Sequence, residues 1–137
     1  MHIHENSFEP AQFLVQNVDL LPKGRVLDVA MGSGRNAIYL ARLGFDVEGV
    51  DMLPEAVDIA LELAQKDAVT IKAQVADLEG NYYIEKDTYV VIICFNYLQR
   101  SLVSQIKDGL RKGGIVVYET FIIAQAHFGR PKNPDYL

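Results

Sequence analysis

Short apolar runs recur along the chain and alternate with segments whose apolar residues have helical spacing. The five runs cover residues 26–30, 45–50, 69–75, 89–95 and 115–121. The fourth and fifth runs are nearly continuous and rich in valine and isoleucine, which is typical of strands buried on both faces. The pattern therefore predicts five β-strands.

The segments between these runs are predicted to be helical. Residues 36–43, 54–66 and 98–110 place apolar side chains three and four positions apart, and residues 10–18 are expected to form a further helix. Gly44 follows the first of these segments, and Gly113 and Gly114 follow the third, as is common just past a helix end. The segment 76–88 is polar, and we interpret it as a loop with one turn at most.

Strands that alternate with helices predict βαβ units, here an α/β fold with a Rossmann-like, doubly wound parallel sheet. The 137 residues contain no repeat, low-complexity tract or linker, so residues 1–137 are predicted to form one domain, with residues 1–20 as an N-terminal helical segment. Half of the residues are hydrophobic and the net charge is only −5, which excludes a disordered chain.

Cysteine usage and hydropathy predict a cytoplasmic protein. Cys94 is the single cysteine, which excludes a disulfide scaffold and a zinc-binding cysteine cluster and fits a reducing compartment. No apolar run approaches the roughly 20 residues that span a bilayer, and the first residues lack the features of a signal peptide. His2 and His4 lie in a terminal stretch and are interpreted as unstructured. We expect no membrane contact and no bound metal.

Charge is distributed unevenly along the chain. Residues 1–97 carry seven basic and fifteen acidic side chains, whereas residues 98–137 carry six and three. The pI near 5.1 argues against a protein that coats nucleic acid. The last forty residues are the part of the chain that we expect to help bind an anion.

The first predicted strand runs into a glycine-containing turn, and a helix follows. Gly32 and Gly34 permit a sharp turn and a close ligand approach where a Cβ atom would collide. Seventeen residues past Gly34, Asp51 ends the second strand, where a carboxylate is placed to accept hydrogen bonds from the two hydroxyls of a ribose. A structural cap at the strand end is the alternative interpretation of Asp51, and of Asp77 at the end of the third strand.

This turn fits two classes of nucleotide-like ligand. Residues 32–37 satisfy the G-x-G-x-x-A fingerprint, which is typical of a nicotinamide-dinucleotide oxidoreductase. Asp28 favours another class, because a carboxylate in a central strand is costly to bury and would repel a pyrophosphate. It suits instead a sulfonium ligand with an amino-acid tail, and Asp77 suits an exocyclic amine such as that of adenine. A module that binds such a ligand, or a partner, without catalysis is the third hypothesis.

These residues resemble the class I S-adenosylmethionine-dependent methyltransferases. The resemblance lies in VLDVAMGSGRN at residues 26–36, DVEGVD at 46–51, ADL at 76–78 and LRKGGIVVYE at 110–119. More narrowly, GRN at 34–36, YLA at 39–41, GFDV at 44–47, FNYLQR at 95–100 and FGRPKNP at 128–134 resemble the tellurite-resistance methyltransferase branch. The resemblance covers residues 20–137, nearly the whole chain.

The resemblance implies S-adenosylmethionine as cofactor, S-adenosylhomocysteine as product, and a set of cofactor-binding residues. These are Asp28, Ala30, Met31, Gly32, Gly34, Arg35, Asn36, Asp51, Met52, Ala76, Asp77, Leu78 and Phe95. Gly32 and Gly34 would lie against the methionine part of the cofactor. Ala30 departs from the family pattern, which usually has glycine there, and its methyl group is expected to narrow the turn and weaken binding.

The remaining cofactor contacts follow from the same resemblance. Asp51 would hold the ribose hydroxyls, and Met52 would pack on the adenine. Asp77, together with the Leu78 backbone, would bind the adenine edge. Phe95, at the end of the fourth strand, would line the floor of the site near the sulfonium.

The acceptor site is expected at the ends of the fourth and fifth strands. Methyl transfer from a sulfonium is an in-line displacement whose reactivity comes from the cofactor, so the protein mainly positions a nucleophile. Arg100, His127 and Arg130 suit an oxyanion of the tellurite or selenite type, since guanidinium groups bind such anions in a bidentate manner. Tyr97 and Glu119 are placed to orient it. Solvated side chains without a binding role are the alternative for the three basic residues.

The chain length fits only part of the family's sheet. A full domain of this class usually continues past the fifth strand into a helix and an antiparallel hairpin, which complete seven strands. Here five strands are predicted, in the family's order 3-2-1-4-5, with residues 122–137 as a tail on the acceptor side. The fifth strand would then be an exposed apolar edge. We expect a truncated domain or a homodimer through this edge, although the tail itself can also cover it.

Overall fold

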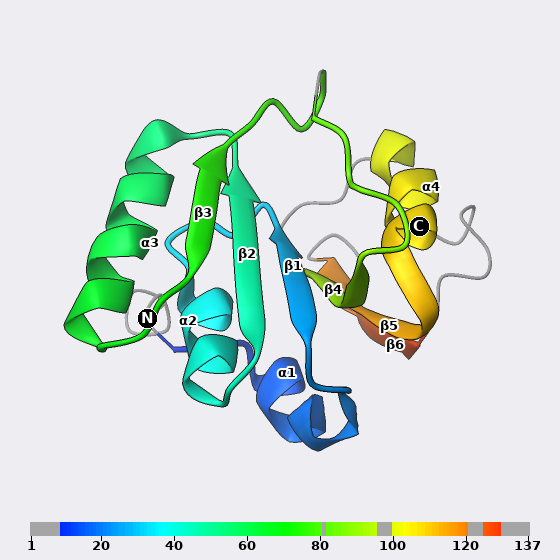
Figure 1. Ribbon diagram of the computed structural model, residues 1–137, viewed down its shortest axis with the longest axis horizontal. Coiled ribbons are helices and arrows are strands. Elements are labelled where there is room, and N and C mark those ends of the chain that lie inside the picture. The colour runs from blue at the N-terminus through cyan, green and yellow to red at the C-terminus, as the bar shows by residue number, and fades with distance from the viewer. Residues whose placement is uncertain (1–8, 81, 96–99, 121–124, 130–137) are drawn as a thin grey trace.

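Every predicted strand has a counterpart in the computed structural model, which describes residues 9–80, 82–95, 100–120 and 125–129 (Figure 1). The strands are β1 (Arg25–Val29), β2 (Asp46–Asp51), β3 (Lys72–Val75), β4 (Tyr89–Cys94), β5 (Leu110–Thr120) and β6 (Gln125–Gly129). The helices are α1 (Gln12–Asn17), the 3₁₀ turn η2 (Val18–Leu20), α2 (Arg35–Arg42), α3 (Pro54–Lys66) and α4 (Arg100–Gly109).

The described residues form one sheet of six strands in the order β3-β2-β1-β4-β5-β6. The first five strands are parallel, which confirms the predicted order 3-2-1-4-5. The sixth strand is antiparallel to β5, with Val116 opposite Gly129 and Thr120 opposite Gln125. The fifth strand is therefore not an exposed edge, because part of the predicted tail folds back and pairs with it, which was one of the alternatives for this edge. The reason to expect a homodimer at that edge is removed.

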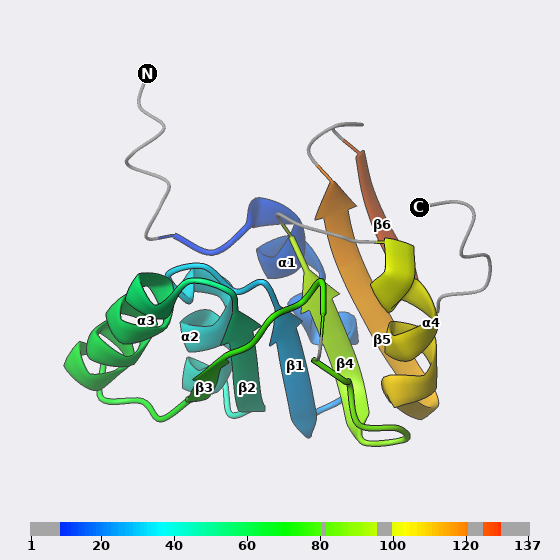
Figure 2. The same cartoon turned by 90° about the horizontal axis from the view of Figure 1, so that it is seen from above.

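Two apolar clusters hold the helices against opposite faces of the sheet. On one face, Leu14 of α1, Leu40 of α2 and Ala60 of α3 pack against strand residues such as Val26. On the other face, α4 and the segment after β3 pack against a second cluster that includes Leu27, Val29, Ile92 and Leu102. Successive residues of a strand point to opposite faces. Asp28 therefore points, like Val26, toward the face that α1, α2 and α3 cover (Figures 1 and 2).

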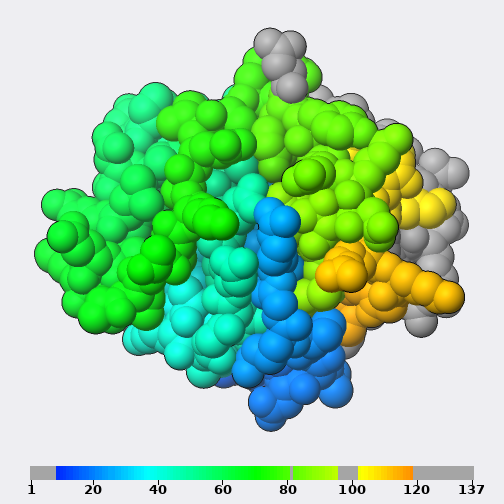
Figure 3. Space-filling model, in the orientation of Figure 1, coloured from blue at the N-terminus to red at the C-terminus, as the bar shows by residue number. Residues whose placement is uncertain are grey.

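The other face of β1, β2 and β3 carries a polar network. The hydroxyl of Tyr89 donates a hydrogen bond to Glu48 Oε2 at 3.0 Å, and Arg25 Nη2 lies 3.2 Å from Glu48 Oε1. Burial, with the nearby Glu48 carboxylate, raises the pKa of Tyr82 to about 12. Figure 3 views this face, where parts of all three strands reach the surface. As predicted, residues 76–80 and 82–88 form a loop, although it has two turns, at residues 78–80 and 86–87, instead of one.

The starts of two strands, β5 and β3, differ most from the predicted ones. α4 ends at Gly109, and β5 begins at Leu110 instead of residue 115, because Leu110 pairs with Tyr89 before a register shift in the ladder. Gly113 accommodates this early start with a positive φ of 85°. β3 begins at Lys72 instead of residue 69. Pairing with a neighbouring strand, which local apolar content does not reveal, sets both limits.

Candidate functional site

The glycine turn, residues 30–34, joins the end of β1 to the first residue of α2. Its backbone is tied to β2, since Met31 N–H donates to the Val50 carbonyl at 2.9 Å. It is also closed on itself, because Gly34 N–H donates to the Met31 carbonyl at 3.0 Å. Ala30, Gly32 and Gly34 all have positive φ, at 59°, 60° and 86°. The turn therefore has one alanine in a conformation that favours glycine.

Gly32 and Gly34 serve different purposes in this turn. A Cβ atom added to Gly34 would lie 2.8 Å from the Cβ of Ala60, so the absence of a side chain lets α2 pack closely on α3. A Cβ atom added to Gly32 would meet nothing within 4 Å. Gly32 thus borders open space, as a residue that a ligand approaches must do, whereas Gly34 is required by helix packing.

Asp51, the last residue of β2, holds the glycine turn in place by a hydrogen bond. Its Oδ2 accepts a hydrogen bond from Gly32 N–H at 2.8 Å, and its Oδ1 accepts one from Leu53 N–H at 3.0 Å. The residue is only 9% exposed. An ionised carboxylate has about four lone-pair sites. Asp51 therefore caps the strand end, as the alternative interpretation had it, and keeps acceptor sites for further hydrogen bonds.

Asp28 is a buried carboxylate beside the turn. It is 2% exposed, and its Oδ2 has no hydrogen-bond partner among the described residues. Burial raises the pKa of Asp28 from 3.8 to about 8; the Asp51 carboxylate adds to this rise and Arg35 opposes it. An unpaired buried acceptor is costly unless a donor or a cation reaches it. The site fits a ligand that carries a positive group toward Asp28.

The predicted adenine contacts lie at the ends of β2 and β3. Ala76 N–H donates to the Asp51 carbonyl at 3.0 Å, which joins these two strand ends. Asp77 is exposed, although its Oδ1 accepts a hydrogen bond from Glu79 N–H at 3.0 Å. Met52 is 39% exposed and offers an apolar surface next to Asp51.

Besides Asp28 and Asp51, four other predicted contact residues have buried side chains. Leu78, Phe95 and Met31 are buried in the two apolar clusters. Asn36 is 4% exposed, and its Oδ1 accepts a hydrogen bond from Ala11 N–H at 2.7 Å. The pattern of apolar and polar residues did not predict the contact between Asn36 and Ala11.

Comparison with known proteins agrees with this geometry. The family model described as "Tellurite resistance protein TehB" matches residues 7–128. The chain belongs to the TehB family. This confirms the resemblance to the class I S-adenosylmethionine-dependent methyltransferases and to their tellurite-resistance branch, and S-adenosylmethionine is the cofactor of this family.

Individual relatives of this TehB-family chain include several kinds of methyltransferase. The "Probable S-adenosyl-L-methionine-dependent methyltransferase TehB" of Haemophilus influenzae is 27% identical over 106 residues, which are 74% of this chain and 37% of the relative. The crystal structure of TehB from Haemophilus influenzae superposes with a TM-score of 0.70 at 23% identity, over 79% of this chain and 40% of that one.

Two further matches are named for particular methyl-transfer reactions. The ubiquinone biosynthesis O-methyltransferase of Colwellia psychrerythraea is 25% identical over 133 residues, 86% of this chain and 54% of the relative. A tRNA (uracil-54, C5)-methyltransferase from Pyrococcus abyssi, solved with S-adenosyl-L-homocysteine, has a TM-score of 0.64 at 26% identity, over 79% of this chain and 27% of that one. The TehB-family chain thus spans about a third to a half of the curated relatives' length.

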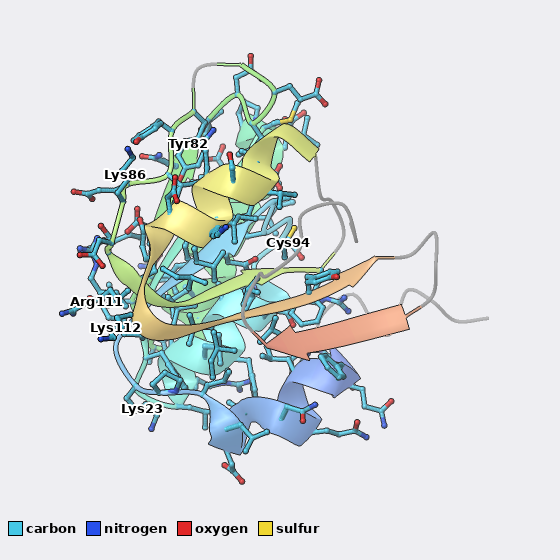
Figure 4. The ribbon with its side chains drawn as sticks, turned by 90° about the vertical axis from the view of Figure 1, so that its right-hand side faces the viewer. Lys23, Tyr82, Lys86, Cys94, Arg111 and Lys112 are labelled. Atoms are coloured by element: carbon cyan, nitrogen blue, oxygen red, sulfur yellow. The ribbon has the colours of Figure 1, made fainter. Side chains whose placement is uncertain are left out.

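The described part of the chain places the backbone of two of the three basic residues predicted for the acceptor. Arg100 begins α4, and His127 lies in β6 opposite Tyr118 of β5. Arg130 lies outside the described residues, as does Tyr97. Arg111 and Lys112 contribute to the basic excess and lie near the N-terminal end of β5 (Figure 4). The glycine turn lies at the opposite edge of the sheet, where the parallel strands end. Much of that excess is therefore remote from the site.

Across residues 9–80, 82–95, 100–120 and 125–129, no three histidine, cysteine or acidic side chains gather as metal ligands would. None of the helices in that part of the chain has the length and apolar content to cross a membrane. Cys94 is buried within β4.

Proposed function

We propose that this TehB-family chain is a cytoplasmic methyltransferase that moves a methyl group from S-adenosylmethionine to a small-molecule acceptor. The observation that carries the proposal is the buried carboxyl group of Asp28, whose Oδ2 has no hydrogen-bond partner among the described residues, beside a glycine turn that borders open space. A cationic ligand supplies what this carboxylate lacks, whereas a pyrophosphate would face two buried acids, Asp28 and Asp51. This contrast disfavours the nicotinamide-dinucleotide alternative.

Each residue of the site would bind a different part of the cofactor. Asp28 would pair with its positive charge, and the open side of Gly32 would let its amino-acid part approach the backbone. Asp51 has acceptor sites left beyond its bonds to Gly32 and Leu53 and would use them for the ribose hydroxyls. The exposed Met52 side chain and Asp77 would take the adenine.

The reaction needs little from the protein besides placement. When bound, S-adenosylmethionine supplies an activated methyl group on a sulfonium. The chain's contribution is to hold the acceptor in line with that group and to exclude water. An acceptor that is already an anion needs no base, because no proton has to leave it.

For the acceptor, we propose an oxyanion of the tellurite or selenite type, with Arg100, His127 and Arg130 as its contacts. Membership of the TehB family supports this choice. The Colwellia relative supports a hydroxyl group on a small organic molecule as the second candidate. An assay with labelled S-adenosylmethionine distinguishes the two, since each acceptor class is offered separately.

Calorimetry with S-adenosylhomocysteine, followed by methyl-transfer assays on both acceptor classes, tests the proposal. Binding together with transfer to one class is the expected result. Absence of binding at millimolar ligand would overturn the cofactor assignment. Binding without transfer to any acceptor would identify a cofactor-binding module instead. A titration with NADH, for which we expect no binding, tests the oxidoreductase alternative directly.

A further inference from the structure

The N-terminal strap, which we define as residues 9–17, is tied to the helix that follows the glycine turn. Asn36, in the first turn of α2, accepts a hydrogen bond at its Oδ1 from Ala11 N–H, at 2.7 Å, in a buried position. The preceding residue, Arg35, donates from Nη1 to the Glu9 carbonyl at 3.2 Å. Figures 1 and 2 both place this part of the chain beside α2. Two consecutive residues next to the turn thus hold two positions of the strap.

The strap depends on such long-range contacts for its position. Its helix, α1, has six residues and no side-chain cap at its N-terminus. Isolated helices of this length are not stable in water. Leu14 anchors the helix in the apolar cluster that α2 shares, but an apolar contact does not fix direction or register as a buried hydrogen bond does. The bond from Ala11 to Asn36 supplies that directional constraint.

Asp28 points toward the same side of the sheet as the strap and α2. Its burial leaves Oδ2 without a hydrogen-bond partner among the described residues. If the strap detached from α2, water would reach this side of the sheet and would hydrate Asp28 in competition with the ligand.

We propose that Asn36 is a positioning residue for the cofactor, acting through the strap and not by touching the ligand with its oxygen. By holding Ala11, it keeps the strap against α2 and keeps the Asp28 side of the site dry. This inference rests on the proposed function, because it concerns affinity for the same ligand. It replaces direct cofactor binding by Asn36, which the family resemblance implies.

The test measures S-adenosylhomocysteine affinity by calorimetry and amide hydrogen exchange across residues 9–17 in the same variants. Asn36→Ala removes the acceptor, and Asn36→Asp restores an acceptor oxygen of similar shape. Ala11→Pro removes the donor instead, at a residue whose φ of −60° suits proline. Asn17→Ala is the matched control, because the hydrogen bond that Asn17 donates, to the Phe13 carbonyl at 2.8 Å, lies within the strap.

We expect Asn36→Ala and Ala11→Pro each to weaken binding by about tenfold, which corresponds to about 1.4 kcal/mol, and to speed exchange across the strap. The double variant should bind no more weakly than either single variant, since both substitutions remove the same hydrogen bond. Asn36→Asp should recover most of the affinity, and Asn17→Ala should match the wild type. In the wild type, the ligand should slow exchange of the Ala11 amide, because coupling is reciprocal.

Faster exchange with unchanged affinity in Asn36→Ala would overturn the inference and leave Asn36 a purely structural residue. Additive losses in the double variant would also overturn it, since they would indicate a separate contact of Asn36 with the ligand. Failure of the wild type to bind S-adenosylhomocysteine would overturn the proposed function itself. That failure is seen without any variant, so the two results are distinguishable.

Discussion

The Asp51 carboxylate and the backbone N–H of Gly32 are joined by a 2.8 Å hydrogen bond that links the end of β2 to the glycine turn. One side chain thus shapes the surface on which the ligand would lie and also offers it acceptor atoms. Removal of the side chain should affect both the fold and binding, and the two effects can be measured separately.

Asp51→Ala should weaken S-adenosylhomocysteine binding by about 1–3 kcal/mol, because N–H groups and ribose hydroxyls lose a buried partner. Thermal unfolding should shift downward as well, since the Gly32 and Leu53 N–H groups lose their acceptor. Asp46→Ala, at the exposed start of the same strand, is the control and should leave affinity unchanged. Calorimetry that gave wild-type affinity for Asp51→Ala would remove Asp51 from the site.

The positions of the acidic residues could be predicted from the sequence, but their partners could not. The alternation of strands and helices places Asp28, Asp51 and Asp77 at or near strand ends on one edge of the sheet. Which backbone N–H groups face Asp51 depends on how the turn folds, and the sequence admitted both a cap and a ribose contact. For Asn36 the partner is Ala11, twenty-five residues earlier, and no local pattern indicates such a pair.

The missed strand has a similar cause. β6 covers Gln125–Gly129, a segment with no run of branched apolar residues and with a glycine at its end. Its extended form is defined by pairing with residues 116–120 of β5. The apolar run of β5 showed that its edge needed a cover, but it did not indicate which segment would provide one.

Comparison of Ala30 with Ala68 measures how much an alanine in the left-handed conformation destabilises the glycine turn. Both have left-handed φ values, 59° and 58°, but only Ala30 belongs to the glycine turn. Relief of about 1–2 kcal/mol of steric cost is offset in part by the greater freedom of glycine in the unfolded chain. We expect each alanine-to-glycine change to stabilise the protein by up to about 1 kcal/mol in urea unfolding.

Only Ala30→Gly should also strengthen S-adenosylhomocysteine binding, because it widens the turn where the family usually has glycine. Calorimetry on Ala30→Gly and Ala68→Gly separates the backbone effect from the effect on the ligand. Equal affinity in the two variants would show that the Ala30 methyl group does not narrow the site.

Gly32 and Gly44 form a second pair. Their φ values are 60° and 97°, and an added Cβ atom would meet nothing within 4 Å at either residue. Substitution by alanine should therefore destabilise both by a similar amount, about 1 kcal/mol or more. Only Gly32→Ala should weaken S-adenosylhomocysteine binding, by about tenfold, because its methyl group enters the space that the ligand would occupy. A loss of affinity as large in Gly44→Ala would contradict this role of Gly32.

Asp28 should make the stability of the protein depend on pH. Its pKa is about 8 in the folded chain and 3.8 as an ordinary aspartate. Between these values the folded state keeps a proton that the unfolded chain has lost, so raising the pH removes stability, by up to about 1.4 kcal/mol per pH unit. Below pH 3.8 and above about pH 8, the contribution of Asp28 to stability does not change with pH. In urea unfolding from pH 5 to pH 8, the wild type should lose stability relative to Asp28→Asn, and parallel curves would contradict the buried, protonated carboxyl group.

The same carboxylate should couple binding of S-adenosylmethionine to proton release. A positive ligand favours the ionised form of Asp28, so bound cofactor should lower the pKa that burial raises to about 8. Affinity should then rise between pH 6 and pH 8, and calorimetry in two buffers of different ionisation enthalpy should report protons released on binding. Asp28→Asn should bind more weakly at pH 8 and release no proton. Proton release that persisted in Asp28→Asn would place the titrating group elsewhere, and Asp28 would then not be the residue that receives the cation.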